Sequence, residues 1–81
     1  MQASERVQTE IQRVIGDDPT IAEANRIIVS VEKKGFWLSA KECVLLKGHV
    51  HDDLDRQKAE KIALLHSGGR QVINEIAVLH G

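Results

Sequence analysis

The sequence predicts an α+β domain, in which a three-stranded mixed sheet carries two helices packed on one face in the order α-β-β-α-β. Two segments space their apolar residues three and four positions apart, as a helix with one buried side does. Three other segments place apolar residues at alternate positions, as strands with a buried face do. One layer of helices covers only one face of the sheet, so the other face is available for binding.

The first helix is predicted over residues 4–15, where apolar residues fall at i, i+4, i+7 and i+8 counted from Val7. Gly16 ends it, and Pro19 fixes its own φ and keeps the preceding residue out of helical geometry. Residues 20–25 have the spacing of a capping box, which predicts one short helical turn before the sheet.

The other four elements follow without a linker or an internal repeat. Residues 26–33 and 43–50 are predicted to be the first two strands. The second helix is predicted over residues 53–66, beginning at an aspartate cap and ending before a pair of glycines. Residues 72–79 are the third strand, and their apolar residues on both sides indicate a partly covered second face.

Length and composition predict one domain over residues 1–81, with 42% hydrophobic and 28% charged residues. The net charge of −1 argues against nucleic-acid binding, which draws its affinity from clustered lysine and arginine. Cys43 is the single cysteine, so the chain has no internal disulfide. Residues 1–12 lack the basic start and apolar run of a signal peptide, so a cytoplasmic location is possible.

Two polar or small residues inside predicted strands suggest structural roles. Gly48 lies in a strand interior, where the missing side chain costs stability, so we expect either the close approach of a helix or a bulge at this position. Asn74 lies on the apolar side of its strand, so its amide needs hydrogen-bond partners in a helix end or a loop.

Five short patterns follow one another through the predicted elements: Asp18-Pro19, Ile27-x-Val29-x-Val31, Leu46-x-Gly48-x-Val50, Ala59-x-x-Ile62-Ala63 and Gly69-x-x-Val72-x-Asn74-x-Ile76-x-Val78. In this order and spacing they resemble the BON domain, a small bacterial module named for osmotic-shock and nodulation proteins. The resemblance covers nearly the whole chain. It departs from the usual pattern between the first two strands, where residues 34–42 replace a tight turn.

The resemblance implies a non-catalytic binding module of the bacterial cell envelope, membrane-associated and periplasmic, of a kind connected with stress response. Its implied partner is a phospholipid membrane surface or another envelope protein. The alternative is a protein-interaction domain that binds no lipid and self-associates weakly through a sheet edge, because an exposed edge is a template for another strand.

The segment between the first two strands is the predicted contact site for lipid or a protein partner. It holds both aromatic residues of the chain next to a leucine, and lysines flank them: Lys33, Lys34, Phe36, Trp37, Leu38 and Lys41. An apolar tip with tryptophan among lysines suits a membrane interface, where basic residues meet anionic headgroups. The other interpretation is that both aromatic side chains fold back to complete a small core.

The remaining candidates for chemistry have simpler explanations. His49, His51, Asp52 and Asp53 could hold zinc if His66 or His80 came near. Nothing in their spacing requires it, and solvent-facing histidines beside a helix cap are expected. Cys43 in a strand is expected to be a small packed residue rather than a nucleophile. We therefore predict no enzyme activity, no metal or other cofactor, and no small-molecule substrate.

Overall fold

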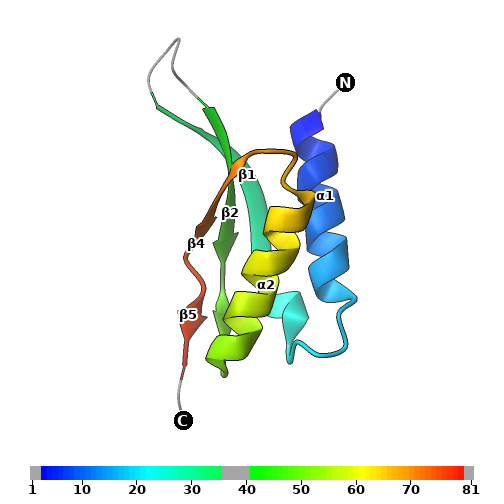
Figure 1. Cartoon of the computed structure of the whole chain (residues 1–81). Helices are drawn as coiled ribbons and strands as arrows, with labels where there is room; N and C mark the ends of the chain where they lie inside the picture. The colour runs from blue at the N-terminus through cyan, green and yellow to red at the C-terminus, as the bar shows by residue number, and fades with distance from the viewer. Residues whose placement is uncertain (1–2, 36–40, 80–81) are drawn as a thin grey trace.

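The structure is a computed structural model that describes residues 3–35 and 41–79 of the chain. Its elements follow the predicted order, so the predicted α+β class is confirmed (Figure 1). The helices are α1 (Ala3–Gly16) and α2 (Asp53–His66), and the short 3-10 helix η1 (Ala24–Arg26) precedes the sheet. The strands are β1 (Ile28–Lys34), β2 (Lys41–Lys47), β3 (His49–Val50), β4 (Gln71–Asn74) and β5 (Ala77–Val78).

β2 is the central strand of the sheet, with β1 on one side and β4 on the other. It runs antiparallel to β1, with Val31 opposite Val44, and parallel to β4, with Val44 opposite Val72. β3 and β5 form a short parallel pair of their own. A parallel pair needs a long crossover connection, and α2 provides it between β3 and β4.

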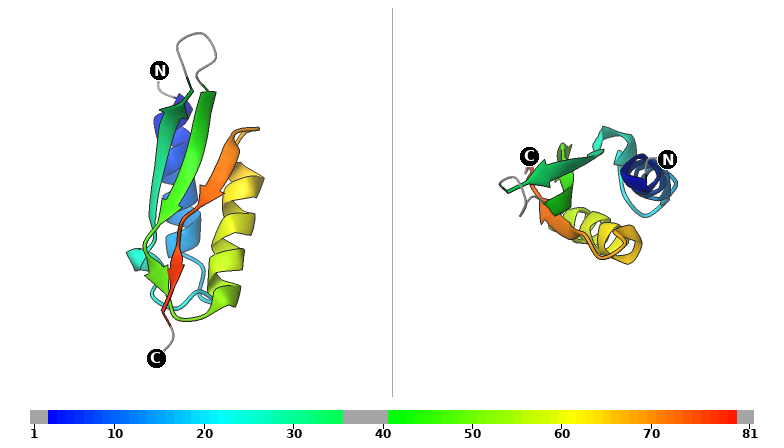
Figure 2. Two further views of the ribbon diagram at one scale, coloured as in Figure 1. Left: turned by 90° about the vertical axis from the view of Figure 1, so that its left-hand side faces the viewer. Right: turned by 90° about the horizontal axis from the view of Figure 1, so that it is seen from above.

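Both helices cover the same face of the sheet, α1 against β1 and α2 against β4 (Figure 2). Ala59 and Ala63 of α2 are fully buried, and their small side chains let the helix lie close to the strands. The largest fully buried side chains between the two layers are Ile11, Ile15, Ile27, Val44, Leu46 and Val50. Within residues 3–35 and 41–79, no helix has both the length and the apolar character needed to span a bilayer.

The second and third strands differ from their predicted forms because each is interrupted once. Gly48 separates β2 from β3 with a φ of +119°, and a Cβ at this position would overlap the backbone carbonyl oxygen of Arg26. Residues 75–76 separate β4 from β5. The parallel pairing continues past both interruptions, because the backbone N–H groups of Glu75, Ala77 and Leu79 donate to the carbonyls of Leu46, Gly48 and Val50.

Two glutamine side chains of α1 reach the outer edge of β1. Gln12 donates from Nε2 to the carbonyl oxygen of Ile27 at 2.7 Å, and its Oε1 accepts the backbone N–H of Val29 at 2.9 Å. Oε1 of Gln8 accepts the backbone N–H of Val31 at 3.2 Å. An open strand edge is a template for a strand of another chain, and the two glutamines of α1 occupy part of the β1 edge. If the chain self-associates through a sheet edge, as the predicted alternative has it, the β4–β5 edge is therefore the candidate.

We expect Gln12→Leu to lower the free energy of unfolding by about 1–2 kcal/mol, because it leaves an N–H and a carbonyl group of the β1 edge without their partner. Urea denaturation measures the change. Gln8→Leu is the matched control, since it removes one longer and more exposed hydrogen bond. An equal loss in the two variants would contradict the two-bond role of Gln12.

Candidate binding surfaces

The base of the hairpin between β1 and β2 extends beyond the third strand of the sheet. β1 and β2 pair as far as Lys34 opposite Lys41, whereas the pairing of β4 begins at Gln71 opposite Cys43. Lys33 and Lys41 are exposed, so positive charge gathers on this two-stranded projection. Phe36, Trp37 and Leu38, the other residues of the predicted contact site, lie outside the described residues.

An open depression lies beside the hairpin base, at the point where β4 begins. Residues from the hairpin and from the α2–β4 turn line it: Gly35, Lys41, Glu42, Cys43, Gly68, Gly69, Arg70 and Gln71. The Arg70 side chain is fixed there, because Nε donates to Oε1 of Glu42 at 2.8 Å and a terminal nitrogen donates to the Ser67 carbonyl at 3.0 Å. This ion pair holds the α2–β4 turn against the hairpin.

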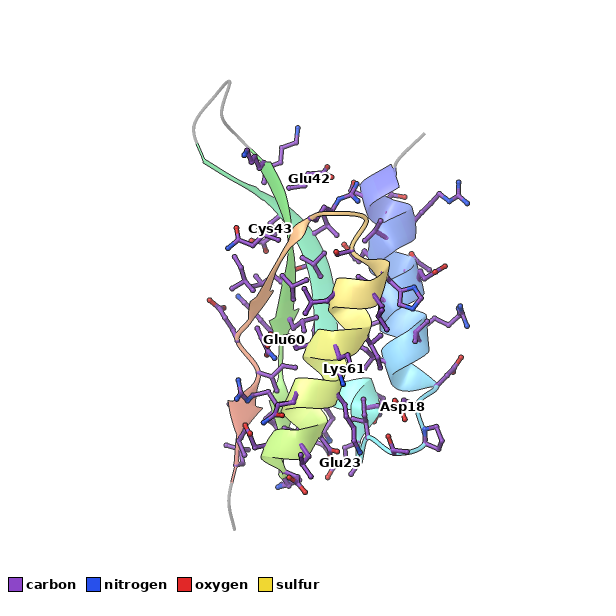
Figure 3. The ribbon with its side chains drawn as sticks, viewed as in Figure 1. Asp18, Glu23, Glu42, Cys43, Glu60 and Lys61 are labelled. Carbon is purple, nitrogen blue, oxygen red and sulfur yellow. The ribbon has the colours of Figure 1, made fainter. Side chains whose placement is uncertain are left out.

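Sequence reasoning missed the Arg70–Glu42 pair, because the two residues are 28 positions apart and neither belongs to a motif. The β2 register shows how they meet. Glu42 lies on the helix side of the strand and Cys43 on the opposite side (Figure 3). Arg70 directly precedes Gln71, the partner of Cys43 in the parallel ladder, so it comes level with Glu42.

The sheet face that points away from the helices has an apolar centre. Cys43 and Leu45 of β2 are 2% and 3% exposed, yet both lie outside the core formed between the sheet and the helices. In the described part of the chain no helix covers this face (Figure 2). Neighbouring strands surround the two side chains, with Ser30 opposite Leu45 on β1 and Ile73 opposite it on β4.

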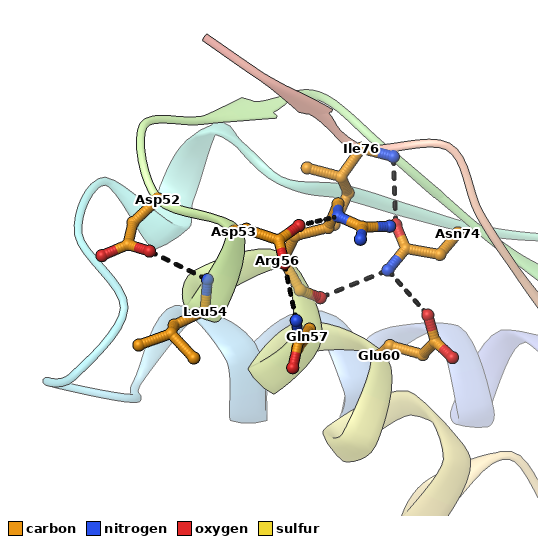
Figure 4. Close-up of polar contacts among 8 residues, drawn as sticks. All are labelled: Asp52, Asp53, Leu54, Arg56, Gln57, Glu60, Asn74 and Ile76. Atoms are coloured by element: carbon orange, nitrogen blue, oxygen red, sulfur yellow. Dashed lines mark hydrogen bonds and ion pairs between the residues drawn. The ribbon is translucent and has the colours of Figure 1, made fainter. Parts of the chain in front are cut away.

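Asn74 links the sheet to α2 at the point where β4 ends (Figure 4). Its Nδ2 donates to the carbonyl oxygen of Arg56 at 3.2 Å and to Oε1 of Glu60 at 3.0 Å. Its Oδ1 accepts the backbone N–H of Ile76 at 3.0 Å. Both the nitrogen and the oxygen of the Asn74 amide thus have hydrogen-bond partners within the protein. This explains why a polar side chain can occupy the helix side of the strand.

Aspartates organise the start of α2 and the turn after α1. Asp52 caps α2 by accepting the Leu54 N–H at 2.9 Å, and Asp53 accepts from Arg56 and Gln57 (Figure 4). In the turn, the Thr20 hydroxyl and then the Thr20 backbone N–H lower the pKa of Asp18, because both donate to its carboxylate. These carboxylates serve local structure, as their capping positions suggest.

The histidine pair near the end of the sheet has contacts within the protein. Nδ1 of His51 lies 3.2 Å from the carbonyl oxygen of Leu79, and Nε2 lies 3.3 Å from Oε2 of Glu23. The ring of His49 meets the His51 ring edge-on, with centroids 6.2 Å apart. Over residues 3–35 and 41–79, no three histidine, cysteine, aspartate or glutamate side chains form a group that could hold a metal ion. Cys43 is a buried free thiol.

Comparison with known proteins gives one family. The model of the BON domain family matches residues 3–80, which is nearly the whole chain. No curated protein matches the sequence.

Proposed function

Because the chain belongs to the BON domain family, we propose that it is a non-catalytic module that binds the anionic phospholipid surface of a bacterial envelope membrane through its β1–β2 hairpin. The family consists of binding modules found in envelope proteins and connected with phospholipid. An envelope location and a lipid partner are therefore the first candidates for this chain.

The observation that carries this proposal is the exposed lysine cluster on the projecting part of the hairpin. Lys33 and Lys41 are exposed, and the backbone register places Lys34 directly opposite Lys41. Glu42, the acidic residue of this projection that faces Lys33 in the register, is engaged by Arg70. Lys33 and Lys41 are therefore available to anionic headgroups, each contributing on the order of 1 kcal/mol near such a surface.

The aromatic residues of the same hairpin complete the proposal. Phe36, Trp37 and Leu38 follow β1 closely in the sequence. Tryptophan favours the headgroup level of a bilayer, because its ring is apolar and its N–H is polar. A cationic base with an apolar tip fits a lipid surface better than it fits a nucleic acid, for which the net charge of −1 is unsuited.

We expect the double variant Lys33→Ala/Lys41→Ala to bind vesicles containing phosphatidylglycerol about thirtyfold more weakly than the natural chain, from roughly 1 kcal/mol per lysine. Cosedimentation with vesicles measures binding, and added salt should weaken it further. Lys61→Ala is the control, since Lys61 lies on α2 among the helices, away from the hairpin (Figure 3).

A second arm tests the apolar tip. Binding should shift the fluorescence of Trp37, the single tryptophan, to the blue, and Phe36→Ser/Trp37→Ser should abolish cosedimentation without unfolding the chain. Binding to phosphatidylcholine vesicles as tight as to anionic ones would contradict the role of the lysines. No binding to either kind of vesicle would overturn the lipid proposal.

A further inference from the structure

The depression beside the hairpin base is lined by backbone groups that can donate hydrogen bonds. Gly68 and Gly69 of the α2–β4 turn line it, and in the described part of the chain their N–H groups have no hydrogen-bond partner. Ser67 has helical dihedral angles and Gly68 has a φ of +65°, a succession that turns consecutive N–H groups toward one concave place. Because glycine has no Cβ, an anion can approach these groups closely.

Arg70 adds a guanidinium to the same place. One of its terminal nitrogens lies 2.9 Å from the position that a Cβ of Gly68 would take, so the guanidinium lies against the turn. Its Nε donates to Glu42 and the same terminal nitrogen donates to the Ser67 carbonyl, and these two bonds fix the planar group in one orientation. Its other N–H groups have no partner among the described residues. A guanidinium held in this way can bind a phosphate oxygen with little further loss of side-chain entropy.

The charged side chains of the depression leave one positive charge in excess. Lys41 and Arg70 are cationic and Glu42 is anionic, and no other charged residue of the described chain lines the depression. A phosphodiester carries one negative charge and neutralises this excess, whereas a dianion leaves a negative charge unmatched. The volume of about 840 Å³ also leaves room for the ester substituents on both sides of the phosphate.

The end of α2 bears on the same site, because a helix C-terminus repels anions through its unpaired carbonyl groups. Two carbonyls at this end have donors of their own. The hydroxyl of Ser67 donates to the Leu64 carbonyl at 3.2 Å, and the Ser67 carbonyl accepts from the guanidinium and from the backbone N–H of Arg70. The repulsion is therefore reduced where the depression lies.

We propose that this depression binds the phosphodiester of a phospholipid headgroup, with Arg70, Lys41 and the N–H groups of the α2–β4 turn as its donors. This assignment rests on the proposed lipid binding, to which it adds a site for one headgroup. The depression lies where β1 and β2 extend beyond β4, so a hairpin whose tip enters a bilayer brings it near the phosphates. A free phosphate ester has the same chemistry, and the experiment below separates the two sources.

Titration of the chain with glycerophosphoglycerol, the water-soluble headgroup of phosphatidylglycerol, tests the site without a membrane. In nitrogen-15 NMR spectra the amide signals of Gly68 and Gly69 and the Nε–H signal of Arg70 should shift and saturate. A dissociation constant on the order of 1–10 mM is expected for so open a site. Inorganic phosphate in its dianionic form should bind more weakly, because its second charge is unmatched. Saturable shifts with inorganic phosphate and none with the headgroup would indicate a site for free phosphate and overturn the assignment.

Two variants change the site in opposite directions. Glu42→Gln should tighten headgroup binding about threefold, because it removes a negative charge while the amide oxygen can still accept from Arg70. Arg70→Lys should weaken binding about tenfold, since lysine keeps the charge but lacks the planar group. Arg56→Lys is the control, because Arg56 pairs with Asp53 at the same 2.8 Å on α2, away from the depression, and its replacement should leave binding unchanged.

The absence of any saturable shift with the headgroup would overturn the site, as would a Glu42→Gln variant that binds no more tightly than the natural chain. Circular dichroism shows whether Arg70→Lys keeps its fold, and Glu42→Gln gives the answer independently if it does not. Vesicle binding without headgroup binding would overturn this site and leave the hairpin proposal standing. Headgroup binding without vesicle binding would do the reverse.

Discussion

Replacing Gly48 by alanine is expected to destabilise the domain by about 3–5 kcal/mol, because a strained backbone and an overlap with neighbouring atoms both oppose the new side chain. The φ of +119° at this position is one that residues with a Cβ rarely adopt. The added Cβ would also overlap the carbonyl oxygen of Arg26, which belongs to the backbone and cannot rotate away. A chain of 81 residues has a stability of roughly 4–12 kcal/mol, so this one methyl group could leave much of the protein unfolded.

Two other glycines separate the two causes in urea denaturation. Gly69 has a φ of +86°, but no atom lies within 4 Å of the place that a Cβ would take, so Gly69→Ala reports strain alone and should cost about 1–2 kcal/mol. Gly16 ends α1 with open space and no positive φ, so Gly16→Ala should cost nothing. If Gly48→Ala lowered the free energy of unfolding by no more than Gly69→Ala does, the overlap with Arg26 would contribute nothing to the loss of stability.

Truncating Leu46 to alanine is expected to cost about 3–4 kcal/mol, within the range seen for buried leucines that leave a cavity. Leu46 is fully buried on the central strand, and it belongs to the core cluster that joins residues of both helices. The strands on both sides of β2 hold the residues around Leu46 in place. These residues therefore cannot move far enough to fill the space left by the removed atoms. Thermal or urea unfolding measures the loss.

Leu65→Ala is the matched control for this truncation. Leu65 lies on α2 and is 76% exposed, so the same chemical change should alter stability by less than about 0.5 kcal/mol. A comparable loss in the two variants would mean that Leu65 is covered in solution, by another molecule or by another part of the chain.

The elements of this fold were predictable because their periodicities are strong. The spacing of Val7 and its successors defined α1, and the capping aspartate and the glycine pair defined both ends of α2. At Gly48 a close approach of a helix or a bulge was predicted, and Arg26 of the 3-10 helix η1 does come close there. The interruption at residues 75–76 was not predicted, because the alternation of apolar residues continues through it. A strand can bend without changing which of its side chains face the core. The sequence pattern indicates which side chains face the core, but it does not indicate where the strand bends.

The surfaces were less predictable than the fold, for a physical reason. Gln8 and Gln12 are ordinary helix residues by their sequence, and their use at the β1 edge depends on where α1 lies over the sheet. The Arg70–Glu42 pair likewise depends on the register that brings Arg70 level with Glu42. The contact role of Phe36, Trp37 and Leu38 remains a prediction from composition.

The central position of β2 also determines the order in which the sheet can form. Its antiparallel partner β1 precedes it directly in the chain, so the β1–β2 ladder needs only a short loop to close. Its parallel partner β4 comes after the whole of α2, and closing that longer connection costs more chain entropy before any contact is gained. In a pulse-labelling refolding experiment, amide protons between β1 and β2 should therefore become protected before those that join β2 to β4.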